Sequence, residues 1–204
     1  MKVWIDIKNS HEPLFFKSIM SQLNEDFFIT SRDFGEVQDL LRLYNIEHTK
    51  VGGRPEGSMF VRKLGFMSRV LKLLLLIDNV DVSLSHASIW GIYSAKLKGI
   101  KTISFTDNEI STDINQFYFK HLDFLFYPDS IPKEVLLSQG ASEEILVPYA
   151  GFKEDIYIAS YEPNKNFLDK LPFRNYVVVR PESNQATYVS NQKSIVKLLV
   201  QNLL

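Results

Sequence analysis

The stretch VWIDIKNSHEPLFFKSI (residues 3–19) decides the fold class of this chain. Its first five residues form a short apolar run, which is typical of a strand. Cap-type residues follow, and then Pro13, a residue favoured in the first turn of a helix. Leu14, Phe15 and Ile19 then recur at helical spacing. The stretch therefore predicts a strand that leads directly into a helix.

The same alternation continues to about residue 150. We expect strands at 3–7, 27–30, 46–51, 81–84, 101–105, 124–127 and 145–148. We expect helices at 14–23, 36–44, 60–75, 88–97, 110–121 and 133–139. Strands that alternate with helices imply parallel βαβ units with right-handed crossovers. The sequence thus predicts the α/β class, with a Rossmann-like, doubly wound parallel sheet whose apolar strands are covered on both faces.

The C-terminal part has a different pattern. It offers one strand, Tyr176–Pro181, and one helix, Ser194–Leu204, which cannot bury a core of their own. They either pack on the first domain or begin a second one. We expect a Rossmann-like domain at 1–155, and a linker with the incomplete start of a second α/β domain at 156–204.

Composition excludes several classes of protein. The formal net charge is −1 with no basic cluster, so a nucleic-acid partner is not expected. The chain has no cysteine, which excludes disulfides, thiolate metal sites and cysteine nucleophiles. Asp6 and Lys8 interrupt any signal-peptide core, and the apolar run Leu73–Ile77 is far too short for a membrane span. We expect a soluble cytoplasmic protein.

The helix at 60–75 allows two interpretations. Phe60, Leu64, Met67, Leu71 and Leu75 mark one apolar face, and basic residues lie largely on another. Such a helix either packs on the sheet or binds a membrane surface. The modest charge favours packing against the sheet.

Ligands of open parallel sheets bind beyond the carboxyl ends of the strands. Polar residues gather at these positions after the first, fourth and fifth strands. They are Asn9, Ser10, His11, Glu12, Ser85, His86, Ser88, Thr106, Asp107, Asn108 and Glu109. If they line one edge, they form a cleft with two histidines and several carboxylates.

Helix capping is the alternative role for several of these residues. Asn9 and Ser10 suit the N-cap of the first helix, Ser85 that of the fourth, and Asp107 or Asn108 that of the fifth. A histidine has no special value as a cap, so capping does not explain His86, and a ligand contact and a structural role are both open for it.

Familiar catalytic motifs are missing. No G-x-S-x-G elbow surrounds Ser85 or Ser88, and no G-x-G-x-x-G follows the first strand. There is no Walker loop. No paired-histidine spacing supports a metal, so no metal site is predicted.

Six segments nevertheless carry a resemblance. The segments VWIDIKNSHEPLFFKSI, SRDFGE, SLSHAS, ISFTDNE, YAGFKEDIYI and YVVVRPESNQATY match, in order, the pattern of the domain of unknown function 354 family. That family resembles the GT-B glycosyltransferase architecture, and is similar in fold to UDP-N-acetylglucosamine 2-epimerase and to lipid and peptidoglycan glycosyltransferases. The resemblance implies that this chain is the N-terminal half of a GT-B fold, truncated early in its second domain.

The resemblance also implies roles. A UDP-sugar or glycan would be the substrate, in glycosyl transfer or sugar epimerisation for polysaccharide biosynthesis, and no cofactor is firmly implied. His11, His86, Asp107 and Glu109 would be catalytic. The substrate-binding residues would be Asp6, Asn9, Ser10, Glu12, Ser85, Ser88, Arg180 and Glu182.

A non-catalytic module is the alternative function. In that case the incomplete second domain would pair with a second copy or with a separate C-terminal half, through the apolar residues of the last helix. In either case the isolated chain is expected to be a poor enzyme.

Overall fold

A computed structural model describes residues 1–53, 57–173, 175–179 and 195–203. The chain divides into two compact units, Met1–Ser160 and Tyr161–Leu204. The first unit contains the whole sheet and all the residues of the candidate site described below.

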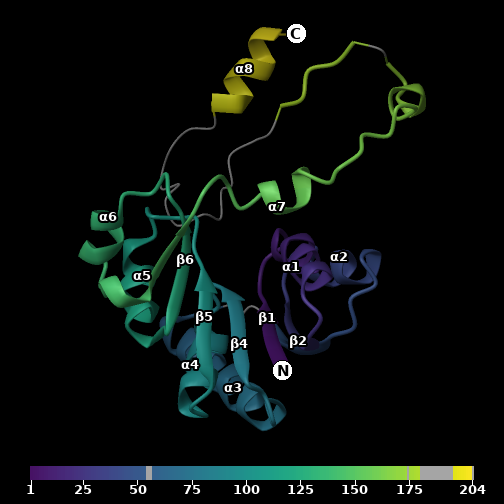
Figure 1. Ribbon diagram of the computed structural model, residues 1–204. Coiled ribbons are helices and arrows are strands. Elements are labelled where there is room, and N and C mark those ends of the chain that lie inside the picture. The colour runs from purple at the N-terminus through teal and green to yellow at the C-terminus, as the bar shows by residue number, and fades with distance from the viewer. Residues whose placement is uncertain (54–56, 174, 180–194, 204) are drawn as a thin grey trace. The chain divides into compact units, whose positions relative to one another are not determined.

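Seven parallel strands form one sheet in the order β3-β2-β1-β4-β5-β6-β7. Figure 1 shows β1, β4, β5 and β6 side by side. The strands are β1 (Lys2–Ile7), β2 (Asp26–Asp33), β3 (Thr49–Gly53), β4 (Val82–His86), β5 (Lys101–Phe105), β6 (Phe124–Pro128) and β7 (Leu146–Tyr149). The predicted Rossmann-like α/β fold is confirmed.

Helices connect the strands and cover both faces of the sheet. They are α1 (Glu12–Gln22), α2 (Val37–Leu43), α3 (Met59–Leu76), α4 (Ile89–Leu97), α5 (Thr112–Tyr118), α6 (Lys133–Ser138) and α7 (Asp155–Ile158). A 3-10 turn, Phe119–His121, continues α5. The helix expected at 110–121 is therefore a shorter α-helix followed by a tighter turn.

Alternation along β1 assigns the helices to the two faces. Val3, Ile5 and Ile7 pack in one core with residues of α1 and α2. Trp4 points the other way, into a core with Leu73 of α3 and residues of α4. Successive side chains of a strand point to opposite faces. Because helices cover both faces of β1, its sequence is an almost continuous apolar run.

The expected orientation of α3 is wrong. Its buried side chains are Arg69, Val70 and Leu73, whereas the predicted core face is exposed, with Phe60 at 69% and Leu75 at 85%. The helix carries apolar residues on more than one side, so periodicity alone could not identify the inward face. Arg69 lies inward because it has a buried acidic partner.

The second unit is described by itself. It holds a 3-10 turn at Leu168–Lys170 and the helix α8 (Ile195–Leu203), which matches the predicted C-terminal helix. Of the strand predicted at 176–181, residues 176–179 are described and are not in a strand, and residues 180 and 181 lie outside the described residues. A strand needs a neighbour to satisfy its hydrogen bonds, and no described residue pairs with these four. Across the residues that the structure describes, no helix is long and apolar enough to cross a membrane.

Candidate functional site

Two histidines meet at the carboxyl ends of β1 and β4. His11 is the residue that precedes α1, and His86 is the last residue of β4. The chain leaves these adjacent strands toward opposite faces of the sheet, which makes this a topological switch point, where open α/β sheets bind ligands. The two rings lie edge to face, with centroids 5.1 Å apart.

Three charged residues join the histidines. Glu12 Oε1 lies 3.9 Å from His11 Nε2, and Asp107 Oδ1 lies 3.3 Å from His86 Nε2. The other oxygen of Asp107 accepts a hydrogen bond from the ammonium of Lys153, which is nearly buried. We call these five residues, His11, Glu12, His86, Asp107 and Lys153, the strand-end cluster.

Two buried atoms of the cluster lack hydrogen-bond partners. Glu12 Oε2 accepts a hydrogen bond from the backbone N–H of Lys8 at 2.7 Å, but Oε1 has no partner among the described residues. His86 Nε2 is likewise unbonded within the described chain, since its contact with Asp107 lacks hydrogen-bond geometry. Unpaired buried polar atoms are costly, so these two are the atoms that a bound polar group would satisfy.

The cluster shifts the pKa of each acid and imidazole in it. Burial raises the pKa of Glu12 to about 7, although Lys8 opposes this. Burial lowers the pKa of His86, against the attraction of Asp107, and burial together with His86 lowers the pKa of His11. Burial acts to raise the pKa of Asp107, but contacts with His86 and Lys153 outweigh it and hold that pKa below its usual range.

These shifts give the groups distinct roles. At neutral pH Asp107 is ionised, both imidazoles are neutral, and Glu12 exchanges its proton readily. Groups with such perturbed pKa values are typical of proton-transfer sites.

An apolar pocket of about 290 Å³ adjoins the cluster. Lys153 lines it, and so does Phe15, whose ring centroid lies 6.0 Å from that of His86. Phe105, Phe126 and Tyr149 supply aromatic walls. A ligand seated here would place an apolar or ring face against aromatic side chains and its polar groups toward the histidines.

A metal ion is a second occupant to consider. Donor atoms of His11, Glu12 and His86 lie within 4.8 Å of one another. However, burial lowers the pKa of both histidines, and the positive charges of Lys153 and Lys8 lower it further. The same charges disfavour a divalent cation, and we assign no metal to this site.

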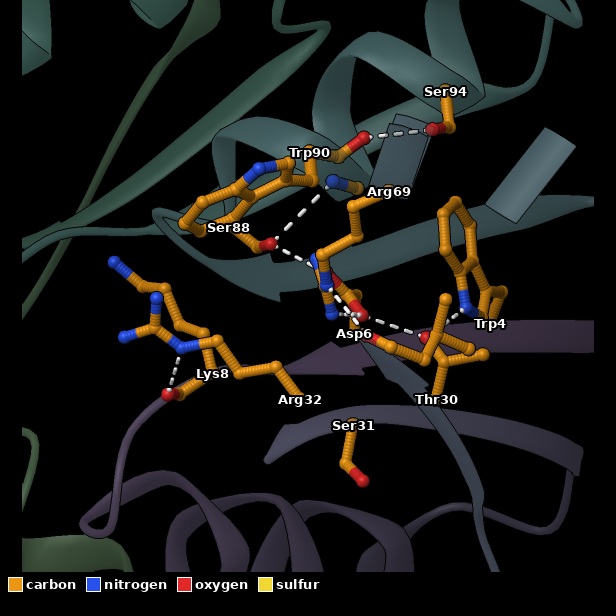
Figure 2. A network of polar contacts seen from close by, with 12 residues as sticks. Trp4, Asp6, Lys8, Thr30, Ser31, Arg32, Arg69, Ser88, Trp90 and Ser94 are labelled. Atoms are coloured by element: carbon orange, nitrogen blue, oxygen red, sulfur yellow. Dashed lines mark hydrogen bonds and ion pairs between the residues drawn. The ribbon is translucent and has the colours of Figure 1, made fainter. Parts of the chain in front are cut away.

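Asp6 lies outside the strand-end cluster, in a buried network of its own (Figure 2). Arg69 donates two hydrogen bonds to its carboxylate, at 2.8 and 2.9 Å. Thr30 and Ser88 donate two more, at 2.7 and 2.5 Å, and Trp4 donates to Thr30 at 2.9 Å. With four donors and no exposed surface, Asp6 ties β2, α3 and α4 to β1.

Ser88, not Ser85, caps α4. The Ser88 hydroxyl accepts a hydrogen bond from the backbone N–H of Gly91. Ser85 is buried inside β4 and has no hydrogen-bond partner among the described residues. Ala87 takes a left-handed backbone conformation between them, and α4 begins at Ile89, one residue after the predicted start.

Asn9 and Ser10 flank the cluster and do not cap α1. Asn9 accepts a hydrogen bond from Arg32 at 3.3 Å, and Ser10 donates one to Glu36 at 2.8 Å. His11 occupies the N-cap position, and its side chain makes no capping hydrogen bond. Both polar residues therefore fix the loop that carries His11.

The remaining predicted residues lie apart from the cluster or are not described. Glu109 is half-buried, and its backbone carbonyl accepts a hydrogen bond from Gln139. Arg180 and Glu182 lie outside the described residues. Lys153 was missed as a site residue, although it lies in the segment YAGFKEDIYI that follows the last strand.

Known proteins share this fold. UDP-GlcNAc 2-epimerase from Methanocaldococcus jannaschii superposes with a TM-score of 0.60 at 18% identity, over 78% of this chain and 48% of that one. The enzyme of the same name from Neisseria meningitidis, solved bound to UDP-GlcNAc, gives a TM-score of 0.60 at 13% identity over 78% and 49%. MurG from Acinetobacter baumannii superposes with a TM-score of 0.58 at 14% identity, over 74% of this chain and 45% of that one.

The chain spans about half the length of these solved structures. At such identities the likeness establishes the fold, which is the Rossmann-like half of a GT-B architecture. No curated protein matches the chain. The whole of the chain, residues 1–204, matches the family described as "Protein of unknown function (DUF354)", and the chain belongs to that family.

Proposed function

We propose that the strand-end cluster performs proton transfer on a nucleotide-linked sugar or its acceptor, in glycosyl transfer or sugar epimerisation. The observation that carries this proposal is the pair of unbonded buried atoms, Glu12 Oε1 and His86 Nε2, beside His11. They lie where open α/β sheets bind ligands. The proteins of similar fold that were solved with UDP or UDP-GlcNAc support the choice of substrate class.

Glu12 is the proposed proton-transferring group. With its pKa raised to about 7, its carboxylate is basic enough to take a proton from a sugar hydroxyl, and its acid form can return one. In glycosyl transfer, the hydroxyl proton would pass to Glu12 as the oxygen attacks the anomeric carbon. The nucleoside diphosphate would then leave with the bonding electrons. In epimerisation, Glu12 would take the proton of the ring carbon next to the anomeric centre, whose C–H electrons would form a C=C bond as the nucleoside diphosphate leaves with the anomeric C–O electrons. Re-addition of the diphosphate, with a proton delivered to the opposite face of that carbon, would complete the inversion.

His86 is the proposed orienting and hydrogen-bonding group. Asp107 Oδ1 lies 3.3 Å from His86 Nε2 without hydrogen-bond geometry, and Lys153 holds Asp107. A sugar hydroxyl that bonds to Nε2 would satisfy this buried atom. His11, at the rim and partly exposed, would contact the same ligand from the solvent side.

The four histidines of the chain supply the test. Imidazole resonances of the 204-residue chain, recorded by NMR, should shift for His11 and His86 when UDP-GlcNAc or UDP-glucose is added at millimolar concentration. His48 bonds to Ile46 and Gln38, and His121 to Tyr93, so their resonances should stay in place.

Matched variants sharpen the result. Glu12→Gln and His86→Asn should each weaken the sugar-nucleotide response at least tenfold, while His121→Asn should leave it unchanged. The proposal would be overturned if the resonances of His11 and His86 did not shift on addition of UDP, UDP-GlcNAc or UDP-glucose. If light scattering of that unresponsive chain also showed a dimer, the assembly-module alternative would replace it.

A further inference from the structure

Helix α3 exposes a continuous apolar stripe. Phe60, Leu64, Met67, Leu71 and Leu75 recur at helical spacing, and each is more than half exposed. The opposite side of the helix holds its buried residues Arg69, Val70 and Leu73. The stripe therefore points away from the sheet along about four turns of helix. A run of this length is larger than the isolated exposed apolar residues of an ordinary surface.

The charges on α3 are all of one sign. Residues Met59–Leu76 contain no aspartate or glutamate, and Arg62, Lys63 and Lys72 are exposed. At 3.6 residues per turn, Lys63 and Lys72 fall on opposite flanks of the stripe. The fourth cation, Arg69, lies inward against Asp6 and does not contribute to this surface.

The apolar surface continues from α3 onto α5. The Phe66 ring lies 6.4 Å from that of Phe117, which is half exposed, and 5.9 Å from that of Tyr93. Beside them lies a hollow of about 420 Å³, lined by Arg62, Lys63, Phe66, Met67, Ile89 and Phe117. Its walls are apolar, and cationic side chains belong to its lining.

We propose that α3 binds the surface of an anionic lipid bilayer. An apolar stripe flanked by cations is the pattern of a helix that lies in the membrane interface. The stripe would enter the boundary between headgroups and acyl chains, Lys63 and Lys72 on its two flanks would meet lipid phosphates, and the hollow would receive part of an acyl chain. This surface is separate from the strand-end cluster, and the inference does not depend on the proposed function.

The charge pattern favours a lipid surface over a second copy of the chain. A symmetric α3–α3 contact through the stripe would bring the flanking Lys63 and Lys72 of each copy close to those of the other, without an acidic residue on either helix. Anionic headgroups instead supply the missing opposite charge along the whole helix.

Co-sedimentation with lipid vesicles tests the inference on the full chain. The protein should bind vesicles of phosphatidylglycerol and phosphatidylcholine, and should bind pure phosphatidylcholine far more weakly. Added salt should weaken binding. The double variant Lys63→Gln, Lys72→Gln should reduce the partition coefficient about thirtyfold. The matched control Lys17→Gln, Lys101→Gln removes two surface cations elsewhere and should have little effect.

A second variant tests the apolar stripe. Leu64→Glu with Leu71→Glu should abolish vesicle binding and, because both side chains are exposed, should leave the circular dichroism spectrum unchanged. Leu43→Glu, at an exposed position on α2, is its control. Absence of binding to anionic vesicles would overturn the proposal. So would a dimer in solution that Leu64→Glu with Leu71→Glu dissociates, because the stripe would then be a self-association surface.

Discussion

Asp6 shows how a single buried carboxylate can organise this fold. Its four hydrogen bonds come from Thr30 in β2, Arg69 in α3 and Ser88 at the start of α4. Burying an ion pair is costly, and it becomes tolerable when the remaining polar atoms are also bonded. The network therefore holds two helices and a neighbouring strand in one arrangement against β1.

Breaking this pair should destabilise the protein strongly. Asp6→Asn or Arg69→Met alone leaves one charged or polar partner buried without its counterpart, and each should lower the free energy of unfolding by about 3–5 kcal/mol. Urea denaturation followed by circular dichroism measures this. The double variant should lose clearly less than the sum of the two single losses.

The exposed pair Asp39 and Arg42 on α2 provides the control. Asp39→Asn should change the stability by less than about 1 kcal/mol, because a solvent-exposed ion pair contributes little. Equal losses for Asp6→Asn and Asp39→Asn would contradict the assigned role of the buried network.

Residue roles were predictable from sequence only in part. The position of His86 at a strand end, with no value as a cap, indicated a ligand-facing group, and the structure places it beside His11 and Asp107. The partners of Asp6 could not be predicted, because Arg69 comes from a helix far along the chain and reads as an ordinary basic residue. Lys153 was not predicted either, because it too reads as an ordinary basic residue.

Helix α4 approaches β1 closely at Gly91. A Cβ atom built there would lie 3.0 Å from the Asp6 Cβ and 3.3 Å from its Oδ2. At an open helical position alanine is more stable than glycine by about 0.5–1 kcal/mol. At this contact, Gly91→Ala should instead destabilise the protein, and Gly91→Val should do so by about 1–3 kcal/mol.

Thermal or urea unfolding of the two variants shows whether each substitution lowers or raises the stability. A stabilising Gly91→Ala would mean that α4 does not pack on Asp6 at this distance. The order wild type, alanine, valine, in decreasing stability, is the expected result.

At the element scale the sequence predicts the strands and helices of the first unit well, since capping residues and breakers separate them. It fails for the inward face of α3, where apolar residues surround much of the helix. It fails also for residues 176–179, because a strand-like composition does not supply a neighbouring strand.

At the scale of the whole molecule, three groups with shifted pKa values, His11, Glu12 and His86, lie at one edge of the sheet, and their effects on stability oppose one another. His11 and His86 have folded pKa values below the usual 6.5. The unfolded chain therefore takes up protons first, and stability falls as the pH drops through about 6.5. Glu12 changes the stability with pH in the opposite direction, because its pKa is raised from 4.5 to about 7. Its favourable contribution is complete below pH 4.5 and is lost as the pH rises through 7.

Glu12→Gln should separate these opposing trends. The variant keeps the shape of the side chain but cannot ionise, so it should match the wild type near pH 4. Its advantage should grow between pH 4.5 and 7 and reach a plateau of up to about 3 kcal/mol at pH 8. Urea unfolding across this range measures the difference. Glu36→Gln alters an exposed acid on the same edge whose pKa is lowered, and should show no such rise. A Glu12→Gln difference that is constant with pH would mean that Glu12 does not titrate in this window, and it would remove the proton-transferring group from the proposed mechanism.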